Sequence, residues 1–143
     1  MFTPSRDEVR TFFAQSWQKH LGRAPLTSME ALAVDIVSLH PEYQRFLTNE
    51  AVATQTEFTV DEGSMNPFLH LSLHLAIEEQ LSIDQPVGLR AEFERILARP
   101  GDRHAATHAV LECLGETVWR SQREGRPIDA EAYLQCVRRQ FSA

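Results

Sequence analysis

Helix start and stop signals occur along the whole chain, and these capping signals constrain the fold more than any other feature. Capping boxes occur at Ser5-Arg6-Asp7-Glu8 and at Thr27-Ser28-Met29-Glu30, where a hydroxyl and a Glu three residues later can cap each other's backbone. Asn66-Pro67 places an Asn N-cap before Pro at the first helical position. Gly22 and Gly125 follow helical segments as stop signals. The sequence therefore predicts a succession of helices.

We predict helices over residues 6–21, 28–40, 42–48, 67–83, 89–99, 103–124 and 130–141. Strands have almost no support, because alternating β-branched runs are missing. Short connections favour antiparallel neighbours, so we expect an all-α, single-domain antiparallel bundle of six or seven helices over residues 1–143. The long connection at residues 54–64 is expected to be a loop suited to a functional role, with a short extended piece at 57–60 as an option.

Composition excludes several classes of partner. A net charge of −6 with scattered Arg argues against nucleic acid and anionic lipid, because phosphate binding needs clustered Lys and Arg. We find no apolar run of membrane-spanning length and no apolar signal segment at the N-terminus, so we expect a cytoplasmic protein. Cys113 and Cys136 form no Cys-x-x-Cys pair, and we expect them to be plain reduced thiols.

Two predicted helices carry His and Glu at four-residue spacing: His70, His74 and Glu78 in one, and His104, His108, Glu112 and Glu116 in the other. Residues four apart lie on one helix face, about 6 Å apart along the axis, so two of them can bind one metal ion. Residues eight apart are about 12 Å apart and cannot easily share an ion. Each ladder therefore supplies at most two ligands, and a complete site needs residues from facing helices.

The helical period also predicts where these ladders point. His70, His74 and Glu78 fall in the middle of an apolar arc of their helix. The row that includes His108 and Glu112 lies beside the apolar stripe of its helix, where it faces either a partner helix or the wet boundary of the core. Buried ionisable groups are costly without partners, so the first ladder needs hydrogen bonds or a metal.

Two further histidines have different expected roles. His20 shares a helix face with Phe12, which predicts that it points into the core. His40 ends its helix directly before Pro41, where a helix-capping role is the simpler interpretation. Trp17 and Trp119, at helical spacing among apolar residues, are expected to be core residues.

The sharper hypothesis is a transition-metal site of zinc, iron or nickel in the core. Its candidate ligands are His70, His74, Glu78, His108 and Glu112, with His20 and Glu116 as additional candidates. The Glu-x-x-His spacing of di-iron bundles is missing from both ladders. An ion with an open coordination position would bring hydrolytic or redox chemistry, whereas acid–base catalysis without metal is a weaker option.

The plainer hypothesis is a buried His/Glu hydrogen-bond network in a protein–protein adaptor without chemistry. A homodimer is a third option, and the residues do not decide whether the protein is an enzyme.

The string Asn66-Pro67-Phe68-Leu69-His70-Leu71-Ser72-Leu73-His74-Leu75-Ala76-Ile77-Glu78-Glu79-Gln80 and its continuation to Pro86 resemble the proteobacterial family named domain of unknown function 1841. Glu112-Cys113-Leu114-Gly115-Glu116, Trp119 and the opening Phe2-Thr3-Pro4-Ser5-Arg6 add to the likeness, which spans nearly the whole chain. The resemblance implies a small intracellular bacterial protein. It implies no activity, ligand or catalytic residue, so the metal hypothesis rests on the residues alone.

Overall fold

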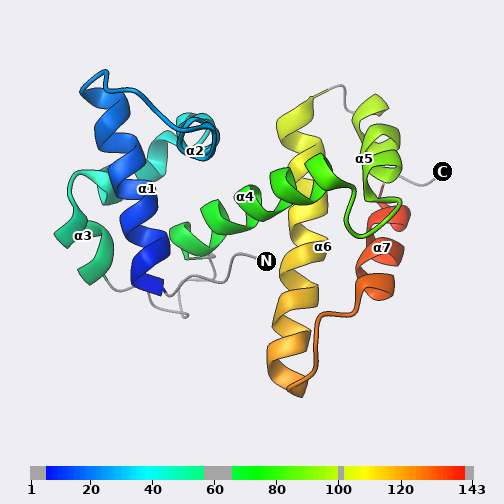
Figure 1. Cartoon of the computed structure of the whole chain (residues 1–143). Coiled ribbons are helices and arrows are strands. Elements are labelled where there is room, and N and C mark those ends of the chain that lie inside the picture. The colour runs from blue at the N-terminus through cyan, green and yellow to red at the C-terminus, as the bar shows by residue number, and fades with distance from the viewer. Residues whose placement is uncertain (1–5, 57–65, 100–101, 141–143) are drawn as a thin grey trace. The chain divides into compact units, whose positions relative to one another are not determined.

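The protein is all-α, as predicted. The computed structural model describes residues 6–56, 66–99 and 102–140, and its elements in these ranges are seven α-helices and one 3-10 helix (Figure 1). Residue contacts divide the chain into two compact units, Met1–Leu75 and Ala76–Ala143. Helix α4 (Pro67–Ile83) contributes to both, and each unit is described by itself.

The first unit consists of α1 (Arg6–Leu21), α2 (Ser28–Ser38), the 3-10 helix η1 (Pro41–Leu47), α3 (Glu50–Gln55) and residues 67–75 of α4. Helix α1 packs against α2, α3 and η1. The core contains one buried face from each of these elements: Phe13, Ala14, Trp17, Ala33, Val34, Ile36, Val37, Leu47, Ala53, Phe68 and Leu71. Burial of these apolar side chains is the main force that holds the short helices together.

Local signals explain how the chain turns between these helices. The Thr27 side chain accepts from Glu30 N–H at 3.1 Å, and Glu30 Oε1 accepts from Thr27 N–H at 2.9 Å, which completes the predicted capping box. Helix α2 ends at Ser38, two residues before the predicted end at His40, because the residue before Pro41 avoids the helical conformation.

The second unit consists of residues 76–83 of α4, α5 (Leu89–Ala98), α6 (Arg103–Glu124) and α7 (Ala130–Arg139). Helices α5, α6 and α7 contact one another in every pairing. Asp102 and Asp129 cap α6 and α7 by accepting from His104 N–H and Ala132 N–H, both at 3.0 Å. The buried Tyr133 hydroxyl donates to Gln80 Oε1 at 2.7 Å, which ties α7 to α4.

Three predictions about local structure need correction or lie outside the described residues. The segment predicted as a helix at 42–48 is the 3-10 helix η1, and α3 extends to Gln55, inside the segment predicted as a loop at 54–64. Most of that loop, including the optional extended piece at 57–60, lies outside the described residues, as does the Ser5 hydroxyl of the first capping box. Among the helices in the described ranges, none has both the length and the apolar character that crossing a membrane requires.

Two predictions about side chains are wrong. Cys113 and Cys136 are not free thiols but form a disulfide between α6 and α7, with their Cα atoms 5.7 Å apart. Trp119 is not a core residue: it is 56% exposed, and the Arg123 guanidinium lies 5.1 Å from its ring centroid. Trp17 is buried, as predicted.

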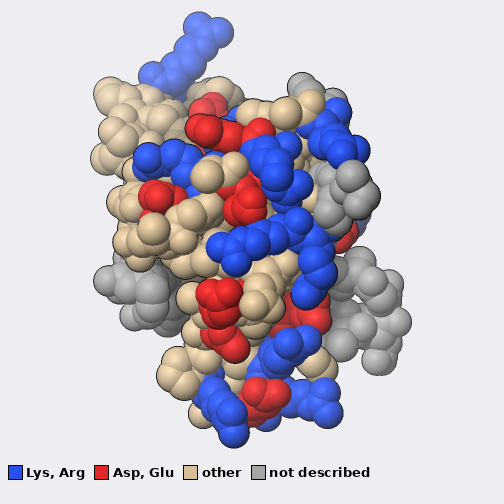
Figure 2. Space-filling model, turned by 90° about the vertical axis from the view of Figure 1, so that its right-hand side faces the viewer, with Lys and Arg blue, Asp and Glu red and all other residues tan. Residues whose placement is uncertain are grey.

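On the face that Figure 2 draws, Lys and Arg side chains lie next to Asp and Glu side chains.

Candidate functional site: a three-histidine cluster

The first member of the cluster is His40, at the junction of α2 and η1. It is 3% exposed, and its backbone N–H donates to Val37 O at 2.9 Å. Its ring Nδ1 lies 2.8 Å from the carbonyl oxygen of Ile36, in the last turn of α2. Because a carbonyl can only accept, Nδ1 of His40 carries a proton, and this bond caps α2 as the sequence analysis expected.

The other two members come from α4. His70 and His74 lie one turn apart on this helix, beside the buried side chains of Phe68 and Leu71, and His74 is only 2% exposed. Nε2 of His70 lies 3.1 Å from Nε2 of His40 and 3.2 Å from Nε2 of His74. A ligating nitrogen of His40 and one of His74 lie within 4.8 Å of each other. We call these residues the three-histidine cluster.

The tautomer of His40 determines what the cluster can do. With Nδ1 protonated, Nε2 of a neutral His40 presents a lone pair toward His70. Nε2 of His70 carries either one N–H bond or one lone pair in the plane of its ring. It therefore cannot donate a hydrogen bond to one neighbour and accept one from the other. When His40 is neutral, His70 is therefore the donor in its contact with His40 and shares that proton with His74. A metal cation would instead satisfy all three lone pairs at once.

The distances between the nitrogens suit a shared ion. Ligand nitrogens about 2.0–2.1 Å from zinc lie about 3.3–3.4 Å apart in a tetrahedral site, and about 3.0 Å apart when adjacent in an octahedral site. The Nε2–Nε2 separations of 3.1 and 3.2 Å fall between these values. The bond from His40 Nδ1 to a backbone carbonyl is also the usual arrangement that orients a metal-bound imidazole.

Tyr43 forms one wall of the cluster. Its ring stacks on His40, with centroids 5.3 Å apart and an interplanar angle of 4°, and its centroid lies 5.7 Å from that of His70. Burial raises the pKa of the Tyr43 hydroxyl, and the charge of Glu42 adds to the effect. The phenol therefore stays neutral at physiological pH, where it orients His40 rather than adding an anionic ligand.

The second ladder lies in the other unit. His104 and His108 are one turn apart in α6, are half-buried, and have ring centroids 4.1 Å apart. A ligating nitrogen of each lies within 4.8 Å of one of the other, as expected for an i,i+4 pair that can bind one ion. The backbone N–H of His104 is held by Asp102, so the N-cap fixes the start of the ladder.

The predicted carboxylate ligands are engaged elsewhere or face solvent. Both oxygens of Glu78 accept from Arg103 Nη2, at 3.0 and 2.8 Å. Glu116 is exposed and pairs with Arg120 four residues later, at 2.7 Å, and Glu112 is exposed.

The expectation that His20 points into the core is wrong. Its side chain is exposed, and its ring lies against Trp17 with centroids 5.0 Å apart. It lies in the last turn of α1, where the helix has passed beyond the core that Phe13 occupies. His20 therefore has a packing role at the surface.

His40 is the site residue that sequence reasoning did not assign to the metal hypothesis. The His-Pro pair was a usable signal, because it predicted a capping role for His40 at the end of its helix. The capping interaction that this signal suggests occupies only Nδ1. The second ring nitrogen remained unassigned because its neighbours, His70 and His74, come from a helix about 30 residues later, and no spacing rule reaches that far.

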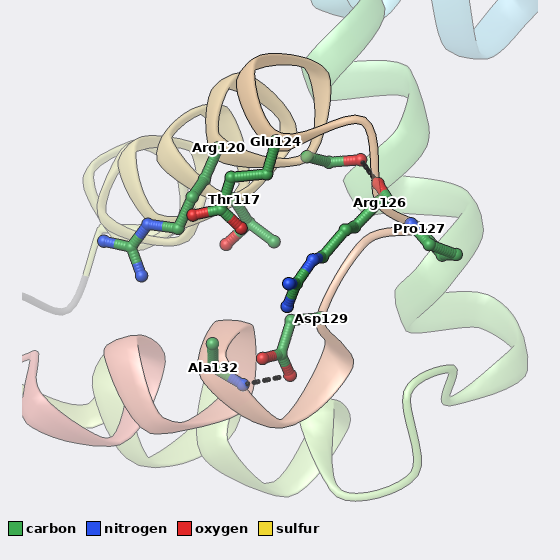
Figure 3. A pocket seen from close by; sticks show the side chains of 8 residues that line it. Thr117, Arg120, Glu124, Arg126, Pro127, Asp129 and Ala132 are labelled. Carbon is green, nitrogen blue, oxygen red and sulfur yellow. Dashed lines mark hydrogen bonds between the residues drawn. The ribbon is translucent and has the colours of Figure 1, made fainter.

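A separate hollow of about 310 Å³ lies in the second unit, between the end of α6 and the start of α7 (Figure 3). Arg120 and Glu124 line it from α6, and Arg126 and Asp129 line it from the segment leading to α7. Asp129 uses its carboxylate to cap α7 at Ala132 N–H. The residues that line the hollow carry charges of both signs and include no paired nucleophile and base. The chemistry of the hollow therefore does not indicate an active site.

Comparisons with known proteins give one result. Searches among curated proteins and among solved structures found no match. The family model described as Domain of unknown function (DUF1841) matches residues 5–139, which is nearly the whole chain, and the protein belongs to this family.

Proposed function

We propose that this protein binds a first-row transition metal ion through the Nε2 atoms of His40, His70 and His74. The convergence of these three nitrogens, with adjacent separations of 3.1 and 3.2 Å, is the observation that carries the proposal. Imidazole nitrogens are preferred ligands of zinc, iron and nickel and poor ligands of magnesium and calcium. The cluster therefore favours the metals that the sequence suggested.

The structure around the cluster supports this proposal in two ways. His40 and His74 are nearly fully buried, so their positions are set by packing rather than by solvent. The Ile36 carbonyl and the stacked ring of Tyr43 hold His40 from two directions, which reduces the entropy lost when an ion binds. A preorganised set of three neutral donors is a suitable site for a dication.

Three protein ligands leave at least one coordination position for a ligand from outside the cluster. Such an ion can polarise a bound carbonyl or phosphoryl oxygen, so hydrolysis is the reaction class we propose if the protein is an enzyme. The alternative is an adaptor in which the imidazoles form only a hydrogen-bond network. The two proposals differ in whether an ion is bound at all.

Elemental analysis of untagged protein, purified without a metal-affinity column, tests the proposal. We expect about one equivalent of zinc, iron or nickel as purified, or on addition of the ion to metal-free protein. Less than about one-tenth of an equivalent, together with no binding on addition, would contradict the proposal and favour the adaptor.

Single variants locate the ion. Competition with a chromophoric zinc chelator should show at least about 100-fold weaker binding for His40→Ala, His70→Ala and His74→Ala, since even second-layer changes reduce affinity 10- to 100-fold. His20→Ala is the matched control, because this exposed histidine belongs to the same unit but packs against Trp17. Equal affinity in His20→Ala and His74→Ala would place the ion elsewhere.

The double variant His104→Ala/His108→Ala tests the ladder in α6 in the same assay. Unchanged stoichiometry and affinity would show that the histidines of α6 are not ligands. A loss would show that the two-histidine ladder binds metal, as the sequence analysis proposed for His108.

A further inference from the structure

The disulfide between α6 and α7 joins one buried cysteine to one half-buried cysteine. Cys113 is 1% exposed, whereas Cys136 is half-buried and lines a hollow of about 170 Å³. The remaining lining residues are Glu116, Thr117, Arg120, Ala132, Gln135 and Arg139. Because disulfide exchange requires a thiolate to reach a sulfur atom, the hollow directs attack to Cys136.

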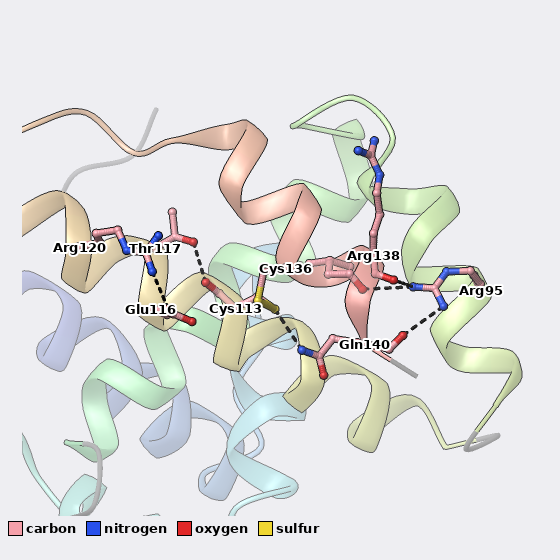
Figure 4. Close-up of a disulfide and its surroundings, with 9 residues drawn as sticks. Arg95, Cys113, Glu116, Thr117, Arg120, Cys136, Arg138 and Gln140 are labelled. Carbon is pink, nitrogen blue, oxygen red and sulfur yellow. Dashed lines mark hydrogen bonds and ion pairs between the residues drawn. A yellow bond between two sulfur atoms is a disulfide. The ribbon is translucent and has the colours of Figure 1, made fainter. Parts of the chain in front are cut away.

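The surroundings of Cys113 suit it to be the leaving group. The side-chain amide of Gln140 donates to Cys113 Sγ at 3.5 Å (Figure 4). When the sulfur–sulfur bond breaks, negative charge develops on the departing sulfur, and a donor already aimed at that atom stabilises it. The hollow beside Cys136 and the hydrogen-bond donor at Cys113 therefore favour the same reaction: attack on Cys136 with Cys113 as the leaving group.

The charges at the hollow indicate which thiols would enter. Arg120 and Arg139 both line it, and the one carboxylate among its lining residues, Glu116, is paired with Arg120 at 2.7 Å. Guanidinium groups bind carboxylates in planar, two-pronged geometry. A small thiol that carries carboxylate groups fits this site better than a neutral or cationic one.

We infer that Cys136 is a site of reversible S-thiolation by carboxylate-bearing low-molecular-weight thiols. The thiolate attacks Cys136 Sγ, and a bond forms between these two sulfurs as the Cys136–Cys113 bond breaks. The electron pair goes to Cys113 Sγ, which takes a proton from water. A second thiol then displaces Cys136, which leaves both cysteines reduced and the two small thiols joined as a disulfide. The small thiol is the only reductant required.

Glutathione is the probe for the first test. Oxidised, folded protein is treated with limiting glutathione, quenched with acid and alkylated, and its peptides are analysed by mass spectrometry. We expect the glutathione adduct on Cys136 and the alkyl group on Cys113. An adduct on Cys113, equal amounts on both cysteines, or reaction only after unfolding would overturn the inference, as would native protein that is isolated with both thiols free.

Rate measurements test the role of Gln140. Gln140→Leu should slow the reaction about fivefold, the equivalent of one ordinary hydrogen bond. Gln135→Leu is the control, because Gln135 lines the same hollow but donates to Glu131 instead. Equal slowing in both variants, with circular dichroism unchanged, would contradict the role of Gln140.

The preference for an anionic thiol is measured against cysteamine, which is cationic, with both rates expressed per thiolate. Glutathione should react several-fold faster, and Arg139→Gln should reduce that ratio toward one. A ratio below one in the unaltered protein would refute the proposed selectivity. His40→Ala should leave the rates with glutathione and with cysteamine unchanged. The outcome of this test therefore does not depend on the proposed metal site.

Discussion

Glu30 shows how one side chain can stabilise both a helix start and a contact between helices. Its Oε2 accepts from Lys19 Nζ at 2.7 Å, and its Oε1 accepts from the Thr27 backbone N–H at 2.9 Å. The Lys19 hydrogen bond is the main reason why the pKa of Glu30 is lowered from 4.5, with the Thr27 bond second. The ionised carboxylate thus links α1 to the first turn of α2.

The lowered pKa gives a pH dependence with a definite sign. Because the carboxyl releases its proton more readily in the folded chain, its contribution to stability is present above about pH 4.5 and is lost as pH falls through the folded value. Glu30→Gln should therefore be less stable than the unaltered protein at pH 7, with the difference shrinking toward pH 3.

Thermal unfolding of both proteins across this pH range measures the effect. Asp35→Asn, an exposed change in the same helix, is the control and should show a smaller difference at pH 7. A difference between Glu30→Gln and the unaltered protein that stays constant with pH would refute the assigned role of the ionised carboxylate.

The C-terminal end of α6 depends on a backbone conformation that only glycine adopts easily. Gly125 has φ of +63°, and an added Cβ would meet no atom within 4 Å. Gly125→Ala should therefore destabilise the protein by about 1 kcal/mol through conformation alone, without a steric clash.

Gly22 provides the comparison at the end of α1. It lacks a positive φ, and the nearest atom to an added Cβ would be Gln18 O at the ordinary contact distance of 3.4 Å. Gly22→Ala should thus change stability by only a few tenths of a kcal/mol. Urea denaturation followed by circular dichroism compares the two variants, and equal losses of stability would rule out the conformational explanation.

Arg10 holds the short helix α3 in place. This buried side chain donates through Nη1 to Ala53 O at 3.2 Å and Thr56 O at 2.7 Å, and its guanidinium lies 4.9 Å from the Phe68 ring centroid. Arg10→Met should cost about 2 kcal/mol, because it leaves buried carbonyls without a charged donor. Amide hydrogen exchange should show faster exchange in α3, whereas Arg45→Met, an exposed change in η1, should not.

Helix boundaries were predictable because the signals that set them are local. Asn66-Pro67 and the Thr27 capping box gave the starts of α4 and α2, since the Asn66 and Thr27 side chains cap backbone groups within three residues of themselves. The 3-10 form of η1 was not predictable. A seven-residue segment after Pro41 has too few hydrogen bonds to favour one helix type, so packing of Leu47 and its neighbours decides.

The candidate site was predictable only in part, for a related reason. Periodicity identified His70 and His74 as a pair on one face, because both lie in the same helix. Periodicity within one helix does not predict contacts between elements that are distant in sequence. The position of His40 beside His70 and the Cys113–Cys136 disulfide were therefore both missed. Periodicity also misjudged Trp119 and His20, because no neighbouring element covers those faces among the described residues.

Metal binding should couple the site to the stability of the chain. An ion that binds only the folded form at 100 times its dissociation constant adds about 2.7 kcal/mol to the free energy of unfolding. Zinc should therefore raise the unfolding temperature of the unaltered protein and of His20→Ala, but not that of His74→Ala. Added protection in hydrogen exchange should concentrate in α2, η1 and residues 67–75 of α4, the elements that hold the three histidines.

The zinc effect should also depend on pH, because protons and the ion compete for the same lone pairs. Free imidazole has a pKa of about 6.5, so stabilisation by zinc should be complete near pH 7.5 and largely lost at pH 5. Its sign is thus the same as that of the Glu30 effect, but it falls at higher pH, because the pKa of Glu30 is lowered from 4.5, so the two are separable. A zinc-dependent shift that persists unchanged at pH 5, or that His74→Ala retains, would mean that carboxylates such as Glu112 bind the ion instead of the imidazoles.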